Sequence, residues 1–371
     1  MRIGFFPGDG GSHRWEREIH PWPRLATDAL VAAGHDVVGL SIGDLRRASV
    51  LSTLDVLHLN WPQSLMQPKS RKFRGKALRY IYRRWFFSTC IRSVNGLKQS
   101  GIPVVWQIHD LPHTSRRDDQ ELMDFLFQRF YELAGGLLFS EASAREPFFQ
   151  KFGPPGGKLI GTAPLGDYSK LHGPARSKEA ARTTLGLGDA RKVFLYPGTV
   201  RWTRNPAGFI GPFLSHSDPR DILIISGRGT AGISHLAVPN RVVIKPGAVE
   251  HEEFRDLLCA ADYIVNDAPQ YLGSAIIRAA LGYGVPVIAH SFGCTSDLAK
   301  GAYIPIPEEP DGVAKALKIA LAIDPTEHRR MSEQAFKNHL ARPWSAYAAG
   351  CSELYSRLVI RSQQPIDGAH D

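Results

Sequence analysis

Short apolar runs alternate with helical patterns along the first half of the chain. Five such runs lie at 1–6, 35–40, 56–59, 104–108 and 136–139, with turn-forming or polar residues between them. Runs of this length are typical of strands that are buried on both faces of a parallel sheet. The segment 23–33 between the first two runs has helical spacing instead. This alternation predicts an α/β domain with an open parallel sheet.

A second series of apolar runs begins after a stretch rich in Pro and Gly at 153–174. It predicts five further strands, at 192–197, 221–226, 241–244, 263–265 and 285–289. The chain has 371 residues, which is more than one ordinary hydrophobic core accommodates. We therefore predict two doubly wound, Rossmann-like domains, at 1–163 and 164–340, and a C-terminal helix and tail at 341–371.

The loops that follow the strands are the expected place for a binding site, because they line the crevice of an open parallel sheet. The small, polar and aromatic residues in these loops of the first domain are Gly10, Gly11, Asn60, Trp61, His109, Asp110 and His113. A glycine pair permits close approach of the backbone to a ligand, although it is also ordinary turn chemistry. An imidazole at a strand end can pair with backbone, and an Asp there can cap a turn. The clustering in one loop favours a functional role for His109.

Two loops of the second domain have the composition of a phosphate site. Gly198 follows a predicted strand and precedes Arg201 and Arg204, while the loop Gly273-Ser274-Ala275 opens a predicted helix. Backbone N–H groups at a helix start have no partner within the helix and can hold a diphosphate. Two arginines in a loop are otherwise an ordinary solvated pair, and the preceding glycine turn favours the site.

Basic residues outnumber acidic ones, 45 against 36, and the excess is concentrated in one block. The residues of this block that recur on two sides of a predicted helix are Lys72, Lys76, Arg79, Arg83, Trp85 and Phe86. A basic helix with aromatic side chains is typical of contact with an anionic membrane surface. A helix that packs its aromatics into its own domain gives the same pattern. Nucleic acid is disfavoured, because no recognition motif accompanies the block.

Other features of the sequence exclude several classes of protein. No apolar run approaches the roughly 20 residues of a membrane span, and the N-terminal run is unlike a secretory signal. The four cysteines are scattered without metal-like spacing, and no Asp-x-Asp pair is present. We expect no metal, reduced thiols and a cytoplasmic location.

The ordered motifs resemble those of GT-B fold glycosyltransferases, most closely the family 4 enzymes of exopolysaccharide assembly. The segments that carry the resemblance are 58–62 (HLNWP), 105–113 (VWQIHDLPH), 164–168 (PLGDY), 198–205 (GTVRWTRN), 273–274 (GS) and 284–286 (GVP). The resemblance implies two facing Rossmann-like domains, with the acceptor bound by the first and the nucleotide-sugar by the second. It also implies a C-terminal helix that crosses back to the first domain.

The resemblance further implies roles for individual residues. Arg201 matches the family's arginine, Arg204 takes the place of its usual lysine, and both are expected to face the donor diphosphate. His109 is expected to reach the transferred sugar at the reacting centre, with Asp110 beside it. The residues expected to bind the donor are Gly10, Gly11, Gly198, Gly227, Gly273, Ser274 and Ala275, and those expected to bind the acceptor are Asn60, Trp61 and His113. The family's two glutamates would fall on Tyr271 and Ala279, which are not acidic.

We therefore expect a nucleotide-sugar-dependent hexosyltransferase that uses a UDP- or GDP-linked donor, with no other cofactor and no metal. The resemblance implies retention of configuration and a saccharide acceptor on a polyprenyl diphosphate, at the inner face of the cell membrane. The missing glutamates keep two alternatives open. One is a GT-B-like protein that binds a nucleotide or glycan without turnover, and the other is a sugar-nucleotide epimerase of the same fold.

Overall fold

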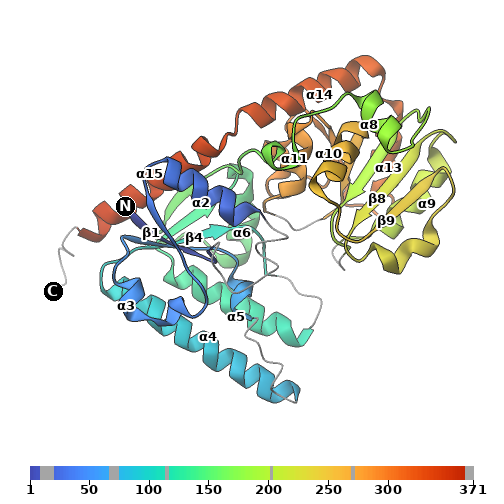
Figure 1. Ribbon diagram of the computed structural model, residues 1–371. Helices are drawn as coiled ribbons and strands as arrows, with labels where there is room; N and C mark the ends of the chain where they lie inside the picture. Colours follow the sequence, from blue (N-terminus) through green and yellow to red (C-terminus); the bar gives the residue numbers. More distant parts are fainter. Residues whose placement is uncertain (9–20, 67–74, 113–116, 201–203, 269–271, 364–371) are drawn as a thin grey trace. The chain divides into compact units, whose positions relative to one another are not determined.

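The computed structural model describes residues 1–8, 21–66, 75–112, 117–200, 204–268 and 272–363, which form two compact units. The first unit runs from Met1 to Pro164 and is joined by the segment from Trp344 onward, and the second runs from Leu165 to Pro343. Both are α/β units built on a parallel sheet, as the sequence predicts (Figure 1).

The sheet of the first unit has six parallel strands in the order β2-β1-β3-β4-β5-β6. The strands are β1 (Arg2–Phe6), β2 (Asp36–Gly39), β3 (Val56–Leu59), β4 (Val104–Ile108), β5 (Gly136–Phe139) and β6 (Leu159–Thr162). The helices are α2 (Trp22–Ala32), α3 (Ala48–Leu51), α4 (Lys76–Gln99), α5 (Arg117–Leu133), α6 (Arg145–Phe152) and α15 (Trp344–Gln363). Every residue of β3, β4 and β5 is buried, because helices cover both faces of the sheet.

The sheet of the second unit repeats this architecture, with parallel strands in the order β12-β11-β10-β7-β8-β9. Its strands are β7 (Val193–Pro197), β8 (Ile222–Gly227), β9 (Val242–Pro246), β10 (Tyr263–Asn266), β11 (Val287–Ala289) and β12 (Tyr303–Pro305). Its helices are α7 (Ser169–His172), α8 (Lys178–Thr184), α9 (Pro206–His216), α10 (His251–Ala260), α11 (Ala275–Gly282), α12 (Thr295–Leu298), α13 (Gly312–Ala322) and α14 (Pro325–Leu340).

The C-terminal helix α15 packs on the first unit, as the fold class predicts (Figure 1). Small residues permit this close packing. A Cβ added at Gly136 would lie 2.6 Å from Leu358, and one added at Gly350 would lie 2.1 Å from the carbonyl oxygen of Thr162. Tyr347 of α15 also donates a hydrogen bond to Gln107 on β4, at 2.9 Å. The end of the chain thus supports the strands beneath the candidate site.

A fully buried arginine fixes α11 within the second unit. The Arg278 guanidinium donates to the carbonyl oxygens of Leu165 at 2.7 Å, His339 at 2.8 Å and Arg342 at 2.6 Å. Leu165 begins the second unit, and Arg342 lies one residue before its end. Arg278 therefore connects α11 to both points at which the chain passes between the units.

Two kinds of feature are absent from the described residues, a membrane-spanning helix and a cluster of metal ligands. None of their helices has the length and apolar character that crossing a membrane requires. Likewise, no three His, Cys, Asp or Glu side chains in this part of the chain gather as metal ligands would. All four cysteines are buried thiols.

Candidate functional site

The structure brings together three of the residues that the sequence predicts for the first unit. Asn60 and Trp61 follow β3, His109 follows β4, and the carboxyl ends of these paired strands meet at one edge of the sheet. The Nε2 atom of His109 lies 3.0 Å from Oδ1 of Asn60. Asp110, the next residue along the chain, lines a hollow at this edge.

Asn60 sets the protonation pattern of His109. The amide nitrogen Nδ2 of Asn60 donates to the carbonyl oxygen of Phe6 at 3.0 Å, and the backbone N–H of Asn60 donates to the same oxygen at 2.8 Å. The side-chain oxygen of Asn60 must then face His109. Because that oxygen can only accept, Nε2 of His109 carries the hydrogen, and in the neutral ring Nδ1 is an acceptor.

Aromatic rings enclose the imidazole of His109. Trp61 stacks on it at 4.7 Å between ring centroids, and Trp22 packs edge-on at 4.6 Å. Trp61 has a φ of 35°, a region that bulky residues rarely adopt. Such strain persists only where the surroundings enforce it, and it is found preferentially at functional sites. Trp22, at the start of α2, was not identified from the sequence.

A buried polar layer supports this edge of the sheet from below. His58 is completely buried between the Tyr355 hydroxyl, 2.5 Å from Nδ1, and Gln107 Oε1, 3.1 Å from Nε2. Burial lowers the pKa of His58 to about 3, so the ring is neutral. The layer holds β3 and β4 in register and couples them to α15.

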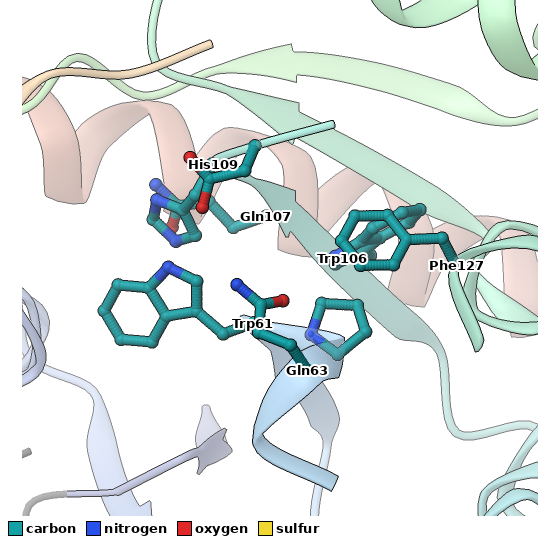
Figure 2. A pocket seen from close by; sticks show the side chains of 8 residues that line it. Trp61, Gln63, Trp106, Gln107, His109 and Phe127 are labelled. Carbon is teal, nitrogen blue, oxygen red and sulfur yellow. The ribbon is translucent and has the colours of Figure 1, made fainter. Parts of the chain in front are cut away.

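The hollow at this edge combines aromatic faces with amide and imidazole groups. It is lined by Trp61, Pro62, Gln63, Trp106, Gln107, His109, Asp110 and Phe127 (Figure 2). Trp106, Gln107 and Phe127 are buried, whereas Trp61, His109 and Asp110 are partly exposed. An aromatic face beside polar groups, as at Trp61 and Asp110, is a usual lining for a sugar ring.

Glycines bring two loops together at the carboxyl edge of the second sheet. Gly198 and Gly227 have φ values of 107° and 136°, which favour glycine. The N–H of Gly198 donates to Ser226 at 2.8 Å, and a Cβ at Gly227 would lie 2.3 Å from the carbonyl oxygen of Gly198. The two predicted donor-binding glycines are therefore in direct contact.

Arg204 is buried, and its charge is balanced within the second unit. Nη1 donates to the carbonyl oxygen of Pro197 at 2.7 Å, and Nε lies 3.7 Å from Asp267 Oδ1. Nε and Nη2 are buried and have no hydrogen-bond partner among the described residues. Asp267 also accepts from the N–H of Asn205 at 3.0 Å and from the hydroxyl of Tyr196. The sequence shows the charge of Arg204 but does not predict its contact with Asp267, which directly follows β10. A contact of Arg204 with a diphosphate stays a prediction.

The start of α11 lies beside the Gly198 loop. Ser274 caps the helix, accepting from the N–H of Ile277 at 3.2 Å. A Cβ at Gly198 would lie 2.7 Å from Ile276 in the first turn of α11. The N–H groups of Gly273, Ser274 and Ala275 thus lie at the end of the sheet where the arginine-bearing loop begins.

Several predicted residues lie outside the described part of the chain. These are Gly10, Gly11, Lys72, His113, Arg201 and Tyr271. Their roles stay predictions.

The surface of α4 differs in one respect from the prediction. Phe86, predicted as a membrane contact, is only 7% exposed, whereas Trp85 is 52% exposed. Consecutive residues on a helix point about 100° apart, and here Phe86 faces the unit while Trp85 faces solvent. Leu78 and Ile81, which the sequence places on the apolar side of the helix but which were not predicted as membrane contacts, are 56% and 62% exposed.

No model of a protein family matches the chain, and no curated protein is significantly similar to it in sequence. Solved structures are nevertheless similar over nearly its whole length. A sucrose-phosphate synthase from Thermosynechococcus elongatus has a TM-score of 0.69 and 16% identity, covering 97% of this chain and 100% of that one. HepE from Anabaena, in complex with UDP, has a TM-score of 0.66 and 14% identity, covering 96% and 100%. The chain has the GT-B fold.

The GT-B assignment confirms the predicted fold class. A glycosyltransferase from Rickettsia africae matches as well, with a TM-score of 0.65 and 11% identity over 96% of this chain and 98% of that one. Because all three identities are this low, the likeness establishes the GT-B fold, and the activity has to be argued from the site.

Proposed function

We propose that the protein is a glycosyltransferase that moves a sugar from a nucleotide-sugar to a saccharide hydroxyl. The observation that supports this proposal is that a chain with the GT-B fold contains the His109 site. In this site Asn60 and Trp61 hold the imidazole of His109 in one orientation. Structures of HepE contain UDP, UDP-glucose, or UDP and glucose, which makes a UDP-sugar the first donor to test. A GDP-linked hexose is the second.

The chemistry follows from where charge develops. As the bond between sugar and nucleotide breaks, negative charge grows on the diphosphate, and groups placed beforehand stabilise it. We assign this role to Arg201 and to the N–H groups at the start of α11, with Arg204 holding the loop. The transfer is proposed to need no metal.

The resemblance supports retention of configuration. In that reaction the acceptor hydroxyl attacks from the side of the departing phosphate, and a phosphate oxygen takes its proton. We assign to His109 the contact with the hydroxyls of the transferred sugar. If the reaction inverts instead, a carboxylate such as Asp110 has to take the proton.

A binding and transfer assay tests the proposal. A nucleotide that binds the folded state raises the melting temperature, so UDP, GDP and their hexose conjugates are screened first. The stabilising donor, carrying a labelled sugar, is then incubated with lipid-linked saccharides. We expect label in the lipid fraction, and loss of transfer with retained donor binding in His109→Ala. Absence of any stabilising nucleotide would contradict the proposal.

One observation favours a second candidate, a protein that binds the nucleotide-sugar without transferring it. The positions of the two family glutamates hold Tyr271 and Ala279, and Ala279 is buried in α11. Donor binding without transfer to any lipid-linked acceptor would identify this candidate. Formation of an epimeric sugar-nucleotide without acceptor would identify an epimerase.

We further propose that the acceptor is a saccharide on a polyprenyl diphosphate of exopolysaccharide assembly, and that α4 brings the protein to an anionic membrane. Leu78, Ile81 and Trp85 are spaced three and four residues apart, so they share one exposed face of α4. Arg84 on the same helix is exposed, and the Arg46 guanidinium lies 5.8 Å from the Trp85 ring centroid. Residues 69–98 contain no acidic side chain. Apolar side chains framed by cations are complementary to anionic headgroups.

Vesicle sedimentation tests the membrane surface. We expect binding to vesicles with anionic lipid, little binding to neutral vesicles, and loss of binding when Leu78 and Ile81 are changed to Ser. Ile319→Ser on α13 is the control, because Ile319 is similarly exposed at 48%. Equal binding of the α4 variant and the control would contradict the proposal, as would binding that ignores lipid charge.

A further inference from the structure

A glycine turn presents one arginine at the carboxyl end of β8. Arg228 is exposed and lies between Gly227 and Gly229, which both have positive φ, at 136° and 82°. Residues other than glycine are strained at positive φ. The backbone conformation on both sides of Arg228 therefore requires glycine. The turn lies at the edge of the sheet where ligands bind in open α/β units.

The turn is held rigidly against the loop after β7. The carbonyl oxygen of Arg228 accepts from the N–H of Val200 at 2.8 Å, and Gly227 packs on the backbone of Gly198. Thr230 is buried, and its hydroxyl lies 2.8 Å from the carbonyl oxygen of Gly227 and 2.9 Å from that of Lys245. These contacts therefore fix the backbone of Arg228 next to the loop that leads to Arg204.

Two other cations near this edge, among the described residues, lie close to carboxylates. Arg204 is buried beside Asp267, and Lys245 lies 2.6 Å from Glu253. Within the ranges that the structure describes, Arg228 forms no such ion pair. A guanidinium with two parallel N–H donors matches the oxygens of a phosphate. Of these three cations, Arg228 is the one whose charge is available to a ligand.

We infer that Arg228 binds the diphosphate of the donor nucleotide. This inference rests on the proposed function and adds a residue to it, because neither the sequence motifs nor the resemblance assigned Arg228. The Gly198 loop and the start of α11 form the adjoining wall, so the diphosphate lies between backbone N–H groups and the Arg228 side chain.

Calorimetric titration of the full-length protein with UDP, GDP and uridine tests the inference. We expect Arg228→Gln to weaken binding of the preferred diphosphate at least about tenfold, the loss expected for one charge-assisted hydrogen bond. Uridine carries no phosphate, so its affinity should not change. Arg228→Lys keeps the charge without the planar fork, and we expect an intermediate loss.

Arg220→Gln is the matched control. Arg220 precedes the same strand at its amino end, is exposed, and pairs only with the neighbouring Asp218. We expect it to bind the diphosphate as the unaltered protein does. If Arg228→Gln also binds with unaltered affinity, the inference is wrong while the proposed function survives. If the unaltered protein binds neither UDP nor GDP, both are wrong.

Discussion

Replacement of Arg278 by Met should destabilise the second unit strongly. The change removes the donor to three carbonyl oxygens, those of Leu165, His339 and Arg342. Leaving a buried acceptor without its donor costs about 1–3 kcal/mol, so the three sum to about 3–9 kcal/mol. Met fills much of the same volume, and removing a buried charge also recovers part of its desolvation cost. We expect a net loss of about 3–5 kcal/mol.

A loss of this size is measurable by calorimetry. For a unit of this length, 1 kcal/mol corresponds to about 2–4 °C, so the melting transition of the second unit should fall by roughly 10 °C. Arg330→Met on α14 is the control, because Arg330 forms an exposed ion pair with Glu327 that contributes little. A fall below about 2 °C in Arg278→Met would refute the reasoning.

The same variant should respond differently to acid. Burial lowers the pKa of His339, and the neighbouring Arg278 charge lowers it further. A lowered pKa means that the folded state binds a proton less readily than the unfolded chain, so acid destabilises it. Without Arg278 the second cause disappears, while Asp167 remains 3.7 Å away. The difference in stability between the two proteins should therefore shrink between pH 7 and pH 5.

Three further predictions concern the candidate site. Because the pKa of His58 is about 3 when folded and 6.5 as a free side chain, its contribution to stability is complete above pH 6.5 and falls by about 1.4 kcal/mol per pH unit below it. Urea midpoints of His58→Gln should depend less on pH between 6.5 and 5. Nitrogen NMR should show the His109 ring with hydrogen on Nε2, and Asn60→Ala should give a mixture of tautomers. Gly227→Ala should cost more than about 2 kcal/mol through backbone strain and contact with the next loop, whereas Gly211→Ala on α9, with open space around it, should be neutral or stabilising by up to about 1 kcal/mol.

The sequence predicts the central strands well and misses two at the sheet edges. Runs at 56–59, 104–108 and 136–139 coincide with β3, β4 and β5, because burial on both faces requires an unbroken apolar sequence. The missed strands are β6 and β12. All four residues of β6 are only partly buried, and β12 has three residues, so neither has the apolar run that indicates a strand.

The candidate site is predictable only where its residues follow strands. Asn60, Trp61 and His109 could be placed together because parallel strands end at a common edge. Trp22 and Tyr347 support that edge from the start of α2 and from α15, and no local pattern connects them to it. Trp22 contacts His109, and Tyr347 contacts Gln107 across 240 residues, and neither contact follows from the order of the strands or leaves a periodic signal in the sequence.

The arginines of the second unit differ in burial, and the amino-acid sequence does not show which of them are enclosed by protein and which face solvent. Arg204 and Arg278 are enclosed, and carbonyl or carboxylate oxygens compensate their charge. Arg278 cannot move toward an arriving phosphate without leaving its carbonyl partners unpaired, which is costly. Nε and Nη2 of Arg204 have no hydrogen bond among the described residues, so a contact of Arg204 with a diphosphate stays a prediction. Arg228 has solvent where those residues have protein, so a phosphate replaces only water. The arginine that fixes α11 and the arginine that an arriving phosphate can reach are therefore different residues, Arg278 and Arg228.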